Sequence, residues 1–125
     1  MNSDKFSLKS RLKSFRFAFS GILSLLKNEH NARIHILAAA VALAAGIILK
    51  INIQEWCLLI IIIGLVFITE LFNTSLETIS DAVDPEWNEK IRKAKDYAAA
   101  AVLISVIAAV IIGALIFIPG ILKLF

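Results

Sequence analysis

Four polar residues at helical spacing are the part of the chain best suited to chemistry: Glu70, Asn73, Glu77 and Asp81. Glu70 closes an apolar run that begins at Trp56, and membrane helices rarely keep a carboxylate so close to hydrocarbon without a functional role. At about 100° per residue, the four side chains fall within a stripe roughly 80° wide on one helix face. Such a stripe could bind a divalent cation, take up a proton, or do both.

Two other segments carry polar residues at the same expected depth. These residues are Asn28, Glu29, Arg33, Lys95 and Asp96. Antiparallel neighbours would bring them and the stripe around one polar pocket. Other roles are open for some of them. Glu29 and Arg33, four residues apart, could form a surface ion pair worth a few tenths of a kcal/mol. Lys95 could be a membrane anchor that snorkels, and Asp81 could solubilise the end of its helix.

These residue types suit phosphoryl transfer. Two carboxylates can hold Mg²⁺ and leave its other positions to phosphate oxygens. A lysine can neutralise phosphate charge, and a further carboxylate can accept the proton of an attacking hydroxyl, which at a membrane edge would belong to a lipid. The chain has neither GxxxxGK[ST] nor GxGxxG, so no P-loop or Rossmann site is predicted. His30 and His35 are not spaced as zinc ligands with a cysteine or a third histidine.

The composition predicts an all-α integral membrane protein that forms one domain over residues 1–125. The chain is 59% hydrophobic with a mean hydropathy of +0.84, which is too apolar for an ordinary soluble domain. Three apolar segments are close to the roughly 20 residues that a span needs: 32–49, 56–72 and 97–118, the last stopped by Pro119. They belong to predicted spans over 32–50, 54–83 and 97–118. The second would be roughly 45 Å long and extend beyond the membrane, with Glu70 near the boundary.

Residues 6–27 predict an amphipathic helix with basic residues beside its apolar stripe. We favour a helix that lies in the membrane interface, and a fourth member of the helical bundle is the alternative. Before the third span, Asp84 and Pro85 predict a helix cap and first position, followed by a short polar helix over 86–95.

Basic residues predict the orientation of the spans. Seven of the 13 Lys and Arg residues precede or begin the first span, and four more lie between the second and third. The positive-inside rule therefore puts the N-terminus and the 83–96 loop in the cytoplasm, and the C-terminus on the far side. No cleavable signal peptide is expected. Cys57 is the only cysteine, so no intrachain disulfide is expected. The net charge of +3 favours anionic lipids and is not a nucleic-acid signal.

The block ELFNTSLETISDAVDPEWNEKIRKAKDYAAAAVLI resembles the signature of the bacterial integral-membrane diacylglycerol kinase and undecaprenol kinase family. The matching positions are Glu70, Asn73, Thr74, Ser75, Leu76, Glu77 and Asp81, then Ala94, Lys95 and Asp96. Upstream, NEHNARIH matches the family's N-E-x-x-x-R segment through Asn28, Glu29 and Arg33. The resemblance covers about residues 10–118, nearly the whole chain.

The resemblance implies a homotrimer in the bacterial cytoplasmic membrane, with three transmembrane helices and one surface helix per protomer. Its active sites would be cytoplasmic, shared between protomers, and would phosphorylate a lipid alcohol from Mg·ATP. Carried over by residue, Glu70 corresponds to the general base, and Glu29 and Glu77 to Mg²⁺ ligands. The polar active-site positions are Arg33, Asn73, Asp81, Lys95 and Asp96, with Lys95 as the phosphate contact.

Two segments bear on the substrate. His35 stands where the proteobacterial diacylglycerol kinases have an acidic residue, and ARIH is closer to the undecaprenol kinases of Gram-positive bacteria. The N-terminal SRLKSFRFAFSGI also resembles their version, which favours undecaprenol over diacylglycerol. The alternative function is a small oligomeric transport or channel protein that uses the stripe of Glu70 and Glu77. The carboxylates cluster at one membrane edge, and the first and third spans have no ionisable residue at mid-membrane, which argues against that alternative.

Overall fold

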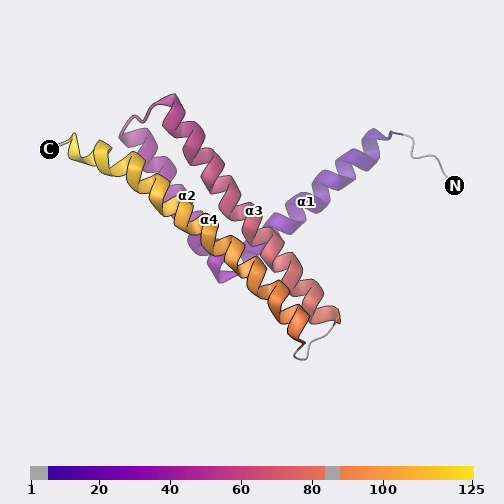
Figure 1. The fold of residues 1–125 in the computed structure, drawn as a ribbon. Coiled ribbons are helices and arrows are strands. Elements are labelled where there is room, and N and C mark those ends of the chain that lie inside the picture. Colours follow the sequence, from indigo (N-terminus) through magenta and orange to yellow (C-terminus); the bar gives the residue numbers. More distant parts are fainter. Residues whose placement is uncertain (1–5, 84–87) are drawn as a thin grey trace.

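The computed structural model describes residues 6–83 and 88–125, which form four α-helices (Figure 1). They are α1 (Leu8–Asn28), α2 (His30–Ile48), α3 (Ile53–Val83) and α4 (Glu89–Leu122). The described residues contain no strand. α2, α3 and α4 are each long and apolar enough to cross a membrane. The prediction of an all-α membrane protein with three spanning helices is confirmed.

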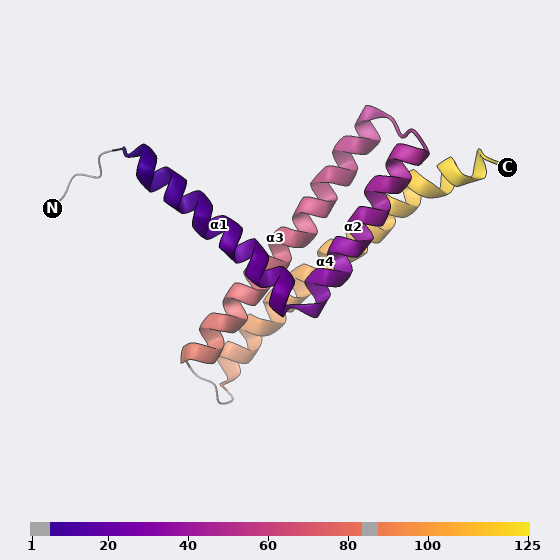
Figure 2. The same cartoon turned by 180° about the vertical axis from the view of Figure 1, so that it is seen from behind.

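α1 projects away from the other three helices and meets them only near its C-terminal end (Figures 1 and 2). Ser7 caps its start by accepting a hydrogen bond from the backbone of Ser10. Leu25 is buried at the far end, whereas apolar residues such as Leu12 and Phe15 are exposed. Within one chain α1 is therefore not a fourth member of the bundle, and its apolar stripe is available to a membrane surface.

α3 and α4 run antiparallel and make the most extensive helix–helix contact of the chain (Figure 1). The buried apolar residues Leu59, Ile62 and Val66 of α3 and Ile116 of α4 belong to this core. α3 has 31 residues and is therefore about 46 Å long, longer than the hydrocarbon core of a bilayer. Its last turns, which carry the polar stripe, must extend beyond the apolar layer.

After α2, a tight turn reverses the chain, so that the first half of α3 lies beside α2. Lys50 takes a positive φ of 52° in this turn. α3 then begins with a reciprocal cap, because Asn52 accepts a hydrogen bond from the Glu55 backbone while Glu55 accepts one from the Asn52 backbone. Gly46 is buried here, and a Cβ at this position would lie 2.8 Å from the Trp56 ring. The absence of a side chain at Gly46 therefore lets α2 approach the start of α3.

α4 differs from the prediction at both ends. The polar helix predicted over 86–95 is not a separate element, because α4 is continuous from Glu89 and its first turn is capped by Asn88. No helix-breaking residue separates this polar turn from the apolar run that follows. The helix also continues through Pro119 to Leu122, although a proline inside a helix removes one i→i−4 backbone hydrogen bond. The cap predicted at Asp84 and Pro85 lies outside the described residues.

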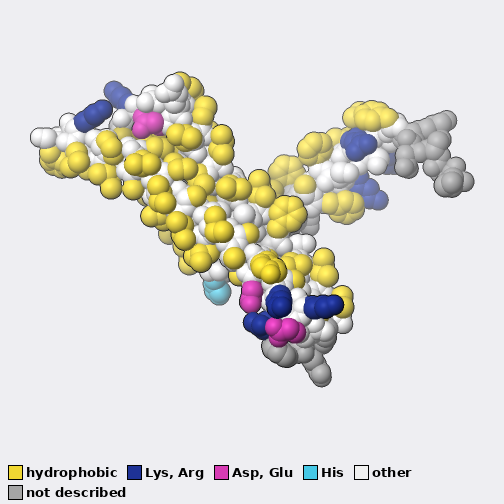
Figure 3. Space-filling view, in the orientation of Figure 1, with side chains coloured by type: hydrophobic (Ala, Val, Ile, Leu, Met, Phe, Trp, Pro, Cys, Tyr) yellow, Lys and Arg dark blue, Asp and Glu magenta, His cyan; other side chains and the backbone are white. Residues whose placement is uncertain are grey.

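Charged side chains gather at the two ends of the bundle, and a belt of hydrophobic side chains separates them (Figure 3). The large exposed hydrophobic residues of α2, α3 and α4 belong to this belt. This distribution is typical of helices that cross a bilayer with polar residues in both interfaces. The protein is a membrane protein.

Candidate functional site

Glu70 is the buried carboxylate at the centre of the candidate site. It lies on α3 and is only 3% exposed. Its Oε1 atom is 2.9 Å from Nε2 of His35, which α2 supplies from the other side of the turn. A buried carboxylate without a polar partner would be strongly disfavoured, so this contact accounts for how the fold accommodates Glu70.

His35 is the site residue that sequence reasoning did not assign. The sequence patterns bear on a zinc role and on substrate preference for His35, but they predict no contact with Glu70, which is 35 positions away. A usable signal was present, because the two residues stand at similar distances along the chain from the turn near Lys50. An antiparallel pair of helices then brings them to the same depth.

The remaining residues of the predicted stripe emerge progressively from the bundle. Glu70 is buried, Asn73 and Glu77 are half-buried, and Asp81 is exposed. Asn73 Oδ1 and Thr74 Oγ1 are buried without a hydrogen-bond partner among the described residues. This region of α3 therefore holds polar oxygens that the single chain leaves unsatisfied.

A polar cleft of about 430 Å³ lies between the C-terminal end of α1 and α3. Hydroxyl, amide and carboxylate groups line it, from Ser24, Asn28, Glu29, Thr74 and Thr78. Glu77 is not among its lining residues. The structure thus brings Glu29 beside the polar face of α3 but does not place both predicted Mg²⁺ ligands in one cleft of one chain.

Arg33 does not form the surface ion pair with Glu29 that is one of the alternatives from the sequence. Its Nε donates a hydrogen bond to the Leu26 carbonyl at 2.9 Å, and its guanidinium also bonds the Lys27 carbonyl. Both carbonyls belong to the last turn of α1, where backbone carbonyl groups have no hydrogen-bond donor within the helix. A cation there can donate hydrogen bonds to them and also interacts favourably with the helix dipole. Arg33 therefore ties α1 to the start of α2.

Lys95 and Asp81 connect the polar ends of α4 and α3 through an ion pair of 3.1 Å. Both side chains are well exposed, at 39% and 69%, so the pair contributes little to stability, about 0.2–1 kcal/mol for pairs of this kind. Asp96 accepts a hydrogen bond from Arg92 on the same helix, at 3.3 Å. Their predicted contacts with nucleotide stay predictions.

A metal site is not assembled within the described part of one chain, where no three His, Cys, Asp or Glu side chains lie close enough together to hold an ion. The donors near the stripe are nevertheless all oxygens, including the unpartnered Asn73 Oδ1 and Thr74 Oγ1. Mg²⁺ prefers oxygen ligands and needs only one or two protein carboxylates when phosphates supply others. The residues present therefore fit Mg²⁺ bound together with a phosphorylated ligand.

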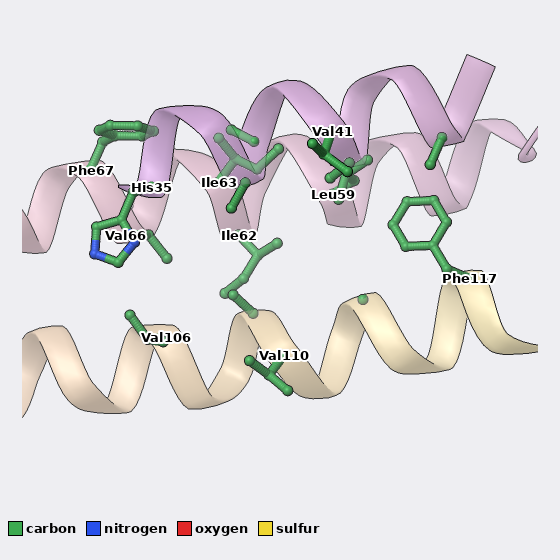
Figure 4. A pocket seen from close by; sticks show the side chains of 16 residues that line it. His35, Val41, Leu59, Ile62, Ile63, Val66, Phe67, Val106, Val110 and Phe117 are labelled. Carbon is green, nitrogen blue, oxygen red and sulfur yellow. The ribbon is translucent and has the colours of Figure 1, made fainter. Parts of the chain in front are cut away.

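An apolar cavity of about 500 Å³ lies between α2, α3 and α4. Figure 4 shows His35 at one end of it, near Val66 and Phe67, and Phe117 at the other. The hydrogen-bonded pair of His35 and Glu70 therefore stands where apolar lining gives way to the polar end of the bundle.

Comparisons with known proteins point in one direction. A family model described as prokaryotic diacylglycerol kinase matches residues 16–117. An undecaprenol kinase of Bacillus subtilis is 36% identical over 107 residues, which are 86% of this chain and 87% of the relative. A diacylglycerol kinase of Synechocystis is 37% identical over 90% of this chain and 65% of its own length. A diacylglycerol kinase of Escherichia coli is 32% identical over 80% of this chain and 82% of its own length.

Proposed function

The chain belongs to the prokaryotic diacylglycerol kinase family and is a lipid kinase, and from that premise we propose that it transfers the γ-phosphate of Mg·ATP to the hydroxyl of a membrane lipid alcohol. The observation that carries the proposal is Glu70, a carboxylate buried at the polar end of a membrane bundle. A carboxylate there can accept the proton of a lipid hydroxyl as that oxygen attacks phosphorus.

The other predicted residues supply the phosphate side of the reaction. Glu29 and Glu77 would hold Mg²⁺, whose chemistry is to neutralise phosphate charge as it develops. Lys95 would contact phosphate oxygens, which requires it to exchange its exposed partner Asp81 for the nucleotide. Because that ion pair is weak, the exchange is energetically inexpensive.

The remaining polar residues would shape the site around the nucleotide. Asn73 has an unpartnered amide oxygen among the described residues, and Asp96 lies on α4 next to Lys95. Arg33 would act by fixing α1 against α2, since its guanidinium is engaged with α1 carbonyls.

A homotrimer in the cytoplasmic membrane would complete the site. Glu29 and Glu77 do not line one cleft of a single chain, so a site shared between protomers is consistent with their separation. The N-terminus and the polar ends of α3 and α4 would face the cytoplasm, where ATP is available. No nucleic-acid partner is proposed.

Undecaprenol is the preferred substrate in this proposal, and diacylglycerol is the second choice. The B. subtilis relative named undecaprenol kinase covers most of this chain, although relatives named diacylglycerol kinase have similar identities. The match of ARIH and the N-terminal segment to undecaprenol kinases gives the preference.

The test uses purified protein in mixed micelles with Mg and γ-labelled ATP, with undecaprenol and diacylglycerol offered in parallel. Label entering undecaprenol with the higher kcat/KM supports the full proposal. A higher value for diacylglycerol overturns the substrate preference alone. If folded and oligomeric protein labels neither lipid, the kinase proposal is overturned. The alternative function as a transport or channel protein is then favoured.

A further inference from the structure

We propose that His35 is a positioning residue for Glu70. The Nε2–H group of His35 would hold Oε1 of the carboxylate, so that the second carboxylate oxygen is the one offered to the lipid hydroxyl. The inference rests on the proposed function, because it takes Glu70 as the base of the transfer.

The contact defines the proton arrangement of the pair. Nε2 of His35 and Oε1 of Glu70 are 2.9 Å apart, a normal hydrogen-bond distance. An ionised carboxylate can only accept hydrogen bonds, so a base-competent Glu70 requires the proton on Nε2. Neither side chain has another hydrogen bond or ion pair within the described ranges 6–83 and 88–125. His35 is thus the polar group that fixes the carboxylate.

The cations expected near the site are directed elsewhere. Arg33 bonds the carbonyls at the end of α1, and Lys95 pairs with Asp81. Neither is paired with Glu70. The carboxylate is therefore oriented by an imidazole and not by the side chain of an arginine or a lysine.

The backbone that carries Glu70 is anchored next to this contact. The hydroxyls of Thr69 on α3 and Ser105 on α4 are 2.9 Å apart, with Ser105 buried and Thr69 half-buried. α3 is thereby held against α4 on one side, while His35 of α2 holds the Glu70 side chain on the other. A base fixed at both its backbone and its carboxylate is preorganised for proton transfer, and a displacement of about 1 Å can cost on the order of 100-fold in rate.

Two substitutions separate a positioning role from a packing role. A glutamine can place its amide N–H where Nε2 of histidine stands, whereas an asparagine is one methylene shorter and reaches only the Nδ1 position. We expect His35→Asn to lower kcat by about 10- to 100-fold through a displaced base, with KM for ATP and the Mg²⁺ requirement unchanged. His35→Gln should recover most of that loss. His30→Gln, at an exposed histidine of the same helix, is the matched control and should leave kcat unchanged.

A second measurement tests the contact without using activity. The chain holds two histidines, so ¹⁵N-histidine labelling in micelles gives one imidazole pair from each. Glu70→Leu removes the acceptor and should shift the Nε2 resonance of His35 while that of His30 stays in place. An unchanged His35 resonance overturns the inference.

The kinetic outcomes distinguish this inference from the proposed function. An active wild type with His35→Gln as slow as His35→Asn, or with both as fast as wild type, overturns the positioning role alone. A wild type that phosphorylates neither lipid overturns the proposed function, and the base role on which the inference rests falls with it.

Discussion

Burying the carboxylate of Glu70 costs free energy that an apolar side chain would not cost. Among the described residues, His35 offsets this cost through a hydrogen bond from an imidazole, a group that can be neutral. Such an arrangement disfavours stability but suits a group that must exchange a proton in a water-poor setting. At the residue scale, the function of this chain therefore depends on the ionisable oxygen of Glu70 more than on its size.

The first prediction is that Glu70→Gln strongly slows phosphoryl transfer and leaves the fold intact. The amide cannot accept the hydroxyl proton, so kcat should fall by the roughly 10²- to 10⁴-fold that general base catalysis contributes. Its carbonyl can still accept the His35 hydrogen bond, and a buried charge is removed, so thermal stability in micelles should be equal or higher. Glu55→Gln on the same helix, at the end far from the site, is the control. Near-normal turnover of Glu70→Gln would show that the base assignment is wrong.

The second prediction concerns the proposed cation ligands. Glu29→Gln and Glu77→Gln each remove one negative charge with little change in volume, so Mg²⁺ should bind less tightly. We expect the Mg²⁺ concentration for half-maximal activity to rise by about tenfold or more, since even outer-shell changes alter metal affinity by about 10- to 100-fold. The measurement is a Mg²⁺ titration at fixed ATP. An unchanged titration for either variant, compared with Glu55→Gln, would remove that residue from the ligand set.

At the scale of elements, the turn between α2 and α3 sets where His35 meets Glu70. Gly46 is buried against the Trp56 ring, and Ile51 also lies close to it. These contacts fix the approach of α2 to the start of α3. A change in the position of α2 relative to the start of α3 would displace His35 relative to Glu70.

The third prediction is that Gly46→Ala destabilises the protein. An added Cβ would lie 2.8 Å from Trp56 and 3.1 Å from Ile51, so the ring or the helix must shift. Overpacking of this kind costs about 1–3 kcal/mol, which unfolding in detergent by SDS titration can measure. Gly113→Ala on α4 is the matched control, because nothing lies within 4 Å of its Cβ. There the better helix propensity of alanine should leave stability equal or higher by up to about 1 kcal/mol. Equal stability of Gly46→Ala and wild type would contradict the packing argument.

The sequence predicts which segments are helices better than it predicts which faces of those helices pack against one another. Apolar runs and helical spacing predict three spanning helices and a polar stripe that contains Glu70. The structure confirms the three helices. α2 and α4 are apolar nearly all round, so the hydrophobic pattern does not reveal which face of either helix packs inward. The contact of His35 and the role of Arg33 at the end of α1 depend on those faces. The change from polar to apolar composition within α4 resembles a helix boundary in the sequence, although the helix is continuous there.

At the scale of the whole molecule, the single chain leaves much apolar surface uncovered. Large hydrophobic residues of all three spanning helices are exposed, for example Ile47, Ile60 and Leu115. Both lipid and further copies of the chain could cover such surface, because lipid tails are as apolar as leucine side chains. Pattern alone therefore cannot distinguish lipid-facing from protein-facing helices, and the trimer stays a proposal.

The fourth prediction concerns orientation, on which access to ATP depends. Glu29, Glu70 and Lys95 can act on cytoplasmic ATP only if the start of α2, the end of α3 and the start of α4 face the cytoplasm. Three spanning helices then put the C-terminus on the opposite side. In a Cys57→Ser background, a membrane-impermeant maleimide should label Asn88→Cys in inverted membrane vesicles and Lys123→Cys in intact cells. Labelling of Ser7→Cys should follow Asn88→Cys, because α1 precedes the first span. If Asn88→Cys reacted in intact cells instead, the carboxylate face would lie away from the nucleotide, and the assignment of every phosphate-side residue would fail together.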